Sequence, residues 1–197
     1  AAVMFDLVTS ASSIHGAYWM EGAGGIFCEN EAMRWLVKLT GMPEGAFGVF
    51  TSGGTAANLS AMVTAREYFR KKKENQNKKG CIITSAGAHS SIKAMAKVID
   101  ADVLLVETDD LMTAEALEEK ISSLDKYTAE RVFAVVATGG TTNAGIVDDL
   151  DGIANICKDH NLWFHVDAAY GGGALAADSV RHLFNGIEKA DSITRSA

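Results

Sequence analysis

The chain has 197 residues, of which 48% are hydrophobic, and it carries a formal net charge of −7. That length is enough for one compact domain or for most of one large domain of a longer protein, and the acidic balance gives no electrostatic reason to expect nucleic acid or an anionic membrane surface as a partner. No apolar run approaches the roughly 20 residues of a membrane helix and no signal-peptide pattern opens the chain, so we expect a cytoplasmic protein with no membrane partner.

A helix is predicted over residues 30–40, because its apolar residues share one side and it stops at Gly41. The first 25 residues show no comparable pattern. We therefore divide the chain into an N-terminal segment and helix, residues 1–46, that lead into one large domain, residues 47–197.

From residue 47 onward, short β-rich runs alternate with helical patterns. We expect strands at 47–51, 81–85, 102–108, 131–138 and 162–167, and helices at 56–73, 89–99, 114–124 and 150–160. Runs such as 131–138 are apolar at consecutive positions, as expected when helices cover both faces of a sheet. The sequence therefore predicts an α/β fold with a mainly parallel sheet and helices on both faces.

Loops at the carboxyl ends of these expected strands carry the residues that suit a ligand site. They are SGGT (52–55), SAGAHSS (85–91), TGGTTNAG (138–145) and DAAYGGG (167–173). In a parallel sheet, ligands collect at this edge, where loops and helix N-termini converge. The sequence thus predicts one site built from four separate segments.

The first of these loops has the features of an anion site. Gly53 and Gly54 allow a tight turn, and Thr55 stands at the start of a helix whose first amides have no partner within the helix. Such a terminus binds phosphate through its amides and its dipole. The alternative is a simple strand-to-helix turn in which Thr55 caps the helix.

Asp167 ends an otherwise apolar strand, where a carboxylate is costly unless a cation, a metal or several donors meet it. A protonated heteroaromatic nitrogen would meet it, and the ion pair would make that ring a better electron sink. The alternative is an aspartate that caps the following turn through local amides. His165 lies two residues earlier on the same face of the strand and is expected to pack behind Asp167.

His89 and Thr142 complete the candidate set. His89 opens a helix, where its imidazole could lie flat on a planar ligand or simply begin the helix. The hydroxyl of Thr142 could hold a ring substituent, although the glycines around it could equally shape a turn. The histidines and cysteines show neither H-E-x-x-H nor C-x-x-C spacing, so no metal is expected. Together, a phosphate cradle, a stacking imidazole, a hydroxyl and a buried carboxylate match the binding requirements of pyridoxal phosphate.

The sequence also resembles the large domain of the group II pyridoxal-phosphate-dependent amino-acid decarboxylases, the family of aromatic-amino-acid, glutamate, cysteine-sulfinate and diaminobutyrate decarboxylases. The resemblance runs from about residue 30 to the end, and its most specific pieces are GVFTSGGTAANLSAM, AHSSIKAMA, VVATGGTTNAGIVDDLDGIA and WFHVDAAYGGGAL. It implies the fold of the fold-type I enzymes, decarboxylation of an L-amino acid to an amine and carbon dioxide, and a homodimer with the active site near the subunit interface.

The resemblance implies a role for each matching residue. Gly54 and Thr55 would bind the coenzyme phosphate, and His89 would stack on the pyridine ring as one of two catalytic residues. Thr142 would lie near the oxygen side of the ring. Asp167 would pair with the ring nitrogen as the second catalytic residue, and Ala169 would pack beneath the ring.

One part of the family pattern lies outside this sequence. The Schiff-base lysine of the family follows a Pro-His pair a few residues beyond the segment that matches ADSIT (190–194), and Lys189 stands before that motif. We therefore expect this chain to be a piece of a longer enzyme, which by itself binds coenzyme poorly and catalyses nothing.

Other interpretations stay open at this point. Aminotransferases, carbon–carbon lyases and cysteine desulfurases share the fold and an aspartate after a strand, so the fold alone does not define the reaction. A scaffold that lacks the lysine and works through its surface, or by pairing with a competent chain, is a non-enzymatic alternative. A nucleotide-binding Rossmann domain is disfavoured because G-x-G-x-x-G is missing.

Overall fold

The computed structural model describes residues 2–195, which form two compact units. The first unit comprises the chain up to Leu39 together with Pro43–Phe50, and the second comprises Thr40–Met42 together with the chain from Thr51 onward. No helix among the described residues is long and apolar enough to cross a membrane. The domain boundary expected at residue 46 stays a prediction.

Two helices account for the first 40 residues. Helix α1 spans Ala2–Ser12, and α2 spans Trp19–Thr40 with non-helical backbone at Gly22. The predicted end of the second helix is confirmed, because Gly41 follows it with a φ of 76°, a conformation that glycine adopts without steric cost. Residues 2–25, which showed no clear pattern in the sequence, thus hold α1, a short connection and the start of α2.

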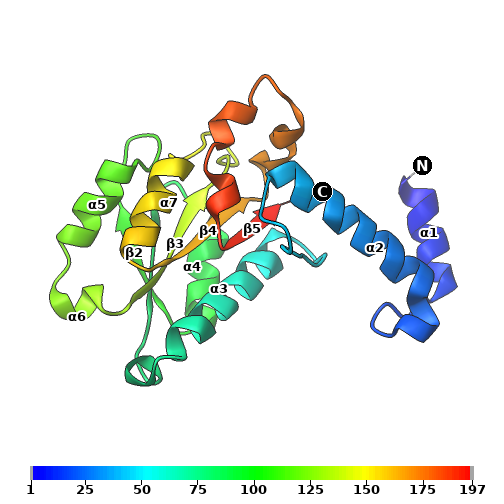
Figure 1. The fold of residues 1–197 in the computed structure, drawn as a ribbon, viewed down its shortest axis with the longest axis horizontal. Helices are drawn as coiled ribbons and strands as arrows, with labels where there is room; N and C mark the ends of the chain where they lie inside the picture. Colours follow the sequence, from blue (N-terminus) through cyan, green and yellow to red (C-terminus); the bar gives the residue numbers. More distant parts are fainter. Residues whose placement is uncertain (1, 196–197) are drawn as a thin grey trace. The chain divides into compact units, whose positions relative to one another are not determined.

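The second unit is built on a five-stranded parallel sheet with strand order β2-β1-β3-β4-β5 (Figure 1). Its strands are β1 (Cys81–Ser85), β2 (Asp102–Val106), β3 (Val132–Thr138), β4 (Trp163–Ala168) and β5 (Ser192–Arg195). All four strand pairs are parallel, and in the register Thr138 lies beside Asp167, which lies beside Thr194. The predicted parallel sheet is therefore confirmed.

Helices cover both faces of this sheet (Figure 1). The helices of this unit are α3 (Gly54–Arg70), α4 (Ser90–Val98), α5 (Ala114–Ser122), α6 (Lys126–Ala129) and α7 (Leu150–Asp159), with short 3-10 helices at Lys73–Asn75, Gly171–Ala176, Arg181–Phe184 and Ile187–Lys189. Helices α3 and α4 pack on each other, and their Met62, Ile92 and Met95 share a core cluster with Ile82 of β1. Helices α5 and α7 pack on each other and contact β2, β3 and β4.

The burial of the strands explains their consecutive apolar runs. Successive side chains of a strand point to opposite faces, and the neighbours Ile82 and Ile83 are both fully buried. All seven residues of β3 are buried as well. Each face of the sheet is therefore core, as the uninterrupted apolar pattern predicted.

The strand expected at residues 47–51 was wrong, because the structure has no strand there. Phe47, Val49 and Phe50 are 69%, 64% and 48% exposed. Aromatic and β-branched residues favour a strand only where they can pack against a neighbouring strand and a buried surface. This segment pairs with none of the five strands, so its local propensity has no partner to stabilise it.

Candidate active site

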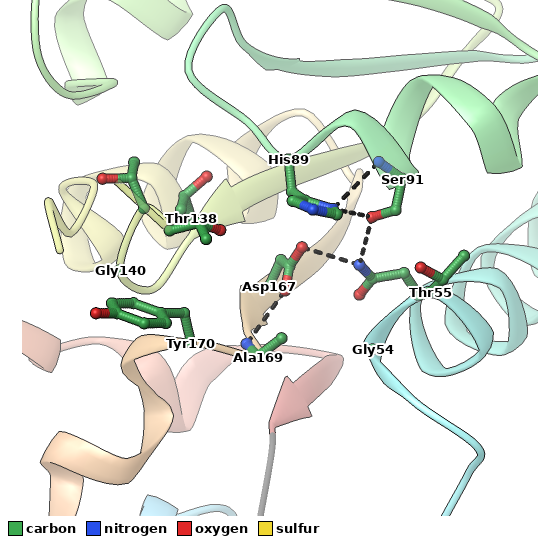
Figure 2. Close-up of a pocket in the computed structure, with 12 residues that line it drawn as sticks. Gly54, Thr55, His89, Ser91, Thr138, Gly140, Asp167, Ala169 and Tyr170 are labelled. Atoms are coloured by element: carbon green, nitrogen blue, oxygen red, sulfur yellow. Dashed lines mark hydrogen bonds between the residues drawn. The ribbon is translucent and has the colours of Figure 1, made fainter. Parts of the chain in front are cut away.

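A cavity of about 270 Å³ lies at the carboxyl edge of β3 and β4 (Figure 2). The four segments predicted from the sequence all line it, and they bring together all six of the predicted site residues: Gly54, Thr55, His89, Thr142, Asp167 and Ala169. The other lining residues are Asn58, Ser91, Thr138, Gly140, Thr141 and Tyr170. The convergence of separate loops on one site is therefore confirmed, while the role of each residue stays a prediction.

The N-terminus of α3 opens into this cavity. The first backbone hydrogen bonds of the helix run from the amides of Ala56 and Ala57 to the carbonyl of Gly53, at 3.0 and 3.1 Å. The amides of Gly54 and Thr55 precede these bonds and are free for a ligand. Gly53 is the N-cap residue, with a φ of 145°, so the alternative in which Thr55 caps the helix was wrong.

Asp167 lies at the floor of the cavity and is only 7% exposed. Its Oδ2 accepts a hydrogen bond of 2.8 Å from Nδ2 of Asn58, and its Oδ1 accepts one of 3.2 Å from the amide of Ala169 (Figure 2). The second bond is the local turn cap that the sequence offered as an alternative. Both donors are neutral, and within residues 2–195 the carboxylate forms no ion pair with a lysine or arginine.

His165 is fully buried beside Asn58, which confirms its predicted packing behind Asp167. Its Nε2 lies 3.0 Å from Oδ1 of Asn58, and its Nδ1 lies 2.8 Å from Oγ of Ser192. Burial lowers the pKa of His165 to about 4, although the carboxylate of Asp167 acts in the opposite direction. His165 is therefore a neutral imidazole at physiological pH.

His89 is the N-cap residue of α4, and its Nδ1 accepts a hydrogen bond of 3.2 Å from the amide of Ser91. The hydroxyl of Ser91 lies 2.9 Å from the same nitrogen. Because Nδ1 is an acceptor, Nε2 of the neutral ring carries the proton. His89 therefore begins the helix, as one sequence alternative stated, and its imidazole also lines the cavity (Figure 2).

The loop after β3 is held by the buried carboxylate of Asp148. Its oxygens accept the amide protons of Thr138 and Met112, each at 2.7 Å. Burial raises the pKa of Asp148 to about 6, against the effect of these two backbone donors. The same loop approaches the turn after β4 closely, since a Cβ on Gly140 would stand 2.7 Å from Cα of Gly171.

The sequence interpretation missed Asn58, Ser91, Asp148 and Tyr170. Asn58 could have been found, because it follows Gly54 by four residues and so lies one helical turn further along the same side. Ser91 likewise follows the helix-opening His89 at the spacing of a cap partner. Lys189 ion-pairs with Asp151 at 2.7 Å, is partly exposed and does not line the cavity, as expected for a surface residue.

The cavity has the chemistry that pyridoxal phosphate requires. A buried carboxylate with only neutral donors is stabilised by a cationic ring nitrogen. None of the described lining residues is a lysine or arginine, so a phosphate would be held by helix amides and hydroxyls. Ala169 packs close to Gly54, because a Cβ added to Gly54 would lie 3.1 Å from the Cβ of Ala169. These two small residues leave room for a flat ring.

The family model described as the pyridoxal-dependent decarboxylase conserved domain matches residues 1–197. The chain belongs to this family. The chain is 32% identical to an aromatic-L-amino-acid decarboxylase of Bacillus atrophaeus, over 98% of the chain and 40% of that relative. It is 34% identical to an L-2,4-diaminobutyrate decarboxylase of Rhizobium meliloti, over 98% of the chain and 39% of that relative.

Solved structures of the family have the same fold. The crystal structure of mouse CSAD superimposes with a TM-score of 0.88 at 34% identity, covering 98% of this chain and 42% of the mouse chain. The chain thus spans about 40% of the length of the relatives it matches. Among the described residues, no three His, Cys, Asp or Glu side chains gather in a way that could hold a metal ion.

Proposed function

We propose that the protein to which this chain belongs is a pyridoxal-phosphate-dependent decarboxylase that converts an L-amino acid to its amine and carbon dioxide. The observation that carries the proposal is the buried carboxylate of Asp167, which faces the cavity and has only neutral donors. The family membership supports it, and the aromatic-amino-acid and diaminobutyrate relatives are decarboxylases by name. Aminotransfer, carbon–carbon cleavage and a purely structural role have no comparable support.

In this proposal each part of the cavity binds one part of the coenzyme. The free amides of Gly54 and Thr55 hold the phosphate at the N-terminus of α3. The imidazole of His89 lies against one face of the ring, and Ala169 lies against the other. Thr142 lies on the side of the ring oxygen.

When bound, pyridoxal phosphate supplies an electron-withdrawing ring that accepts the electron pair left when a carboxylate departs as carbon dioxide. Asp167 keeps the ring nitrogen protonated through a charge-assisted hydrogen bond in a site with little access to water. His89 accepts at Nδ1 from the amide of Ser91, which holds its imidazole at the cavity.

The test of this function is an assay of the whole protein against a panel of L-amino acids, with carbon dioxide release as the readout. We expect release with at least one amino acid and its loss in Asp167→Ala. Wild-type release by that variant would contradict the assignment of Asp167. The panel includes aromatic and diamino L-amino acids, because relatives named for both substrate classes are similarly close in sequence.

We also propose that the protein is a homodimer in the cytoplasm. Helix α1 exposes five large apolar side chains, each at 60% or more: Val3, Met4, Phe5, Leu7 and Val8. A patch of this kind marks an interaction surface, and the family resemblance points to a second copy as the partner. Sedimentation of the whole protein should give a dimer that Phe5→Glu weakens; a wild-type monomer at micromolar concentration would refute the dimer.

A further inference from the structure

Asn58 connects the separate parts of the candidate site. It lies one turn into α3 and is 1% exposed. Its Nδ2 lies 2.8 Å from Oδ2 of Asp167 and 3.4 Å from Oγ of Ser91, while its Oδ1 lies 3.0 Å from Nε2 of His165. One side chain of α3 thus contacts two residues of β4 and the first turn of α4.

The direction of these hydrogen bonds follows from the donors and acceptors available. An ionised carboxylate can only accept, so Asn58 turns its Nδ2 toward Asp167 and its Oδ1 toward His165. Nε2 of His165 must then donate, which leaves Nδ1 of the neutral ring as an acceptor for the hydroxyl of Ser192. That hydroxyl oxygen in turn accepts a bond of 2.8 Å from Nε1 of Trp163.

The result is a continuous chain of satisfied hydrogen bonds from Trp163 to Asp167. The two oxygens of Asp167 are held from different sides, one by Asn58 and one by the amide of Ala169. Rotation of the carboxylate would break both bonds. A shorter branch runs from Asn58 to Ser91 and on to Nδ1 of His89.

We propose, on the basis of the function proposed above, that Asn58 is a positioning residue that aims the carboxylate of Asp167 at the ring nitrogen of the coenzyme and, through Ser91, aligns His89 with it. The side-chain amide of Asn58 then orients both Asp167, the partner of the ring nitrogen, and His89, which stacks on the ring. His165 supports this amide from behind and does not itself line the cavity.

The first test is the dissociation constant of pyridoxal 5′-phosphate for the whole protein and its variants. Removing a hydrogen bond to a charged group weakens binding on the order of 10-fold to 100-fold, so we expect that loss in Asn58→Ala. Asn75→Ala is the matched control, because Asn75 is also a buried asparagine, but its amide donates to the carbonyl of Phe69, away from the cavity. We expect it to change the constant by no more than about twofold. Wild-type affinity in Asn58→Ala would overturn the proposal.

A double-mutant cycle separates positioning from general loss of structure. If His165 acts on Asp167 only through Asn58, His165→Phe should weaken coenzyme binding in the wild type and add less than about twofold in the Asn58→Ala background. If the two substitutions change the dissociation constant by factors that multiply, the two residues act independently. That result would refute the proposed chain of hydrogen bonds. The same cycle with Asn75→Ala should give independent effects.

Asn58→Asp keeps the volume of the side chain and covers the case in which Asn58→Ala fails to fold. It places a second carboxylate within hydrogen-bond distance of Asp167, and two such groups share a proton over part of the pH range. The coenzyme dissociation constant should then gain a titration step that the wild type lacks. Superimposable pH profiles would refute the proposal.

Asp167→Ala distinguishes a failure of this inference from a failure of the proposed function. If Asp167→Ala binds coenzyme as tightly as the wild type, the proposed function is wrong. If Asp167→Ala loses affinity and both Asn58 variants do not, only the positioning role is wrong.

Discussion

Replacing Asp167 with asparagine removes the charge of the carboxylate and one of its two acceptor oxygens. The side chain keeps its size and its place at the end of β4, where it is 7% exposed. An asparagine has one acceptor oxygen in place of two, so it can accept from Asn58 or from the amide of Ala169 but not from both. Whichever of these two donors is left without an acceptor would then face the N–H group of the new asparagine side chain.

The magnitude follows from two opposing effects. In the coenzyme-free protein, the unmatched donor costs about 1–3 kcal/mol, and relief of the buried charge offsets part of that cost. With coenzyme bound, breaking a buried ion pair costs about 3–5 kcal/mol. We therefore expect coenzyme affinity to fall on the order of 100-fold to 5,000-fold while the stability of the coenzyme-free protein changes little.

The assay combines coenzyme retention after dialysis, carbon dioxide release and a denaturant midpoint for the coenzyme-free whole protein. Asp167→Asn and Asp167→Ala should lose both retention and turnover, whereas Asp167→Glu should keep some of each because it keeps the charge. Unchanged retention and turnover in Asp167→Asn would refute the ion pair. A large drop in the midpoint with unchanged retention would show that the carboxylate is only a turn cap.

Further predictions concern the stacking residue, a buried imidazole and a close backbone contact. His89→Phe should retain coenzyme better than His89→Ala by roughly 2- to 10-fold, because only the phenyl ring can stack; equal loss would count against stacking. The pKa of His165 is lowered to about 4 in the folded protein, so the unfolded chain takes up the proton first as the pH falls. The free energy of unfolding should therefore fall from about pH 6.5 toward pH 4, by as much as about 3 kcal/mol more in the wild type than in His165→Gln; parallel curves would contradict this. Gly171→Ala should cost about 1–3 kcal/mol in denaturant unfolding, because its Cβ would overlap the loop after β3, whereas Gly173→Ala, which meets nothing within 4 Å, should be nearly neutral. Equal effects of the two glycine changes would show that this close approach is relaxed in solution.

Local pattern was sufficient for most of the second unit. The runs at 81–85 and 132–138 are apolar at most of their consecutive positions, as expected for a strand covered on both faces, and both are buried strands in the structure. Three of the four polar and glycine-rich loops follow β1, β3 and β4, and they were placed at one edge because parallel strands share the direction of their carboxyl ends. The same reasoning was wrong for residues 47–51, where the apolar residues have no neighbouring strand.

The amino-acid sequence by itself therefore determined the fold class, the edge of the sheet at which the cavity lies and six of the residues that line it. Only the tertiary structure decided that Asn58 bridges Asp167, 109 positions away, and His165, 107 positions away. Such bonds depend on the strand order and on how α3 lies across β4. Periodicity in the sequence is a local property, so it gives no information about either. The lowered pKa of His165 and the raised pKa of Asp148 have the same origin, because burial is produced by the whole fold and not by the neighbouring residues in the chain.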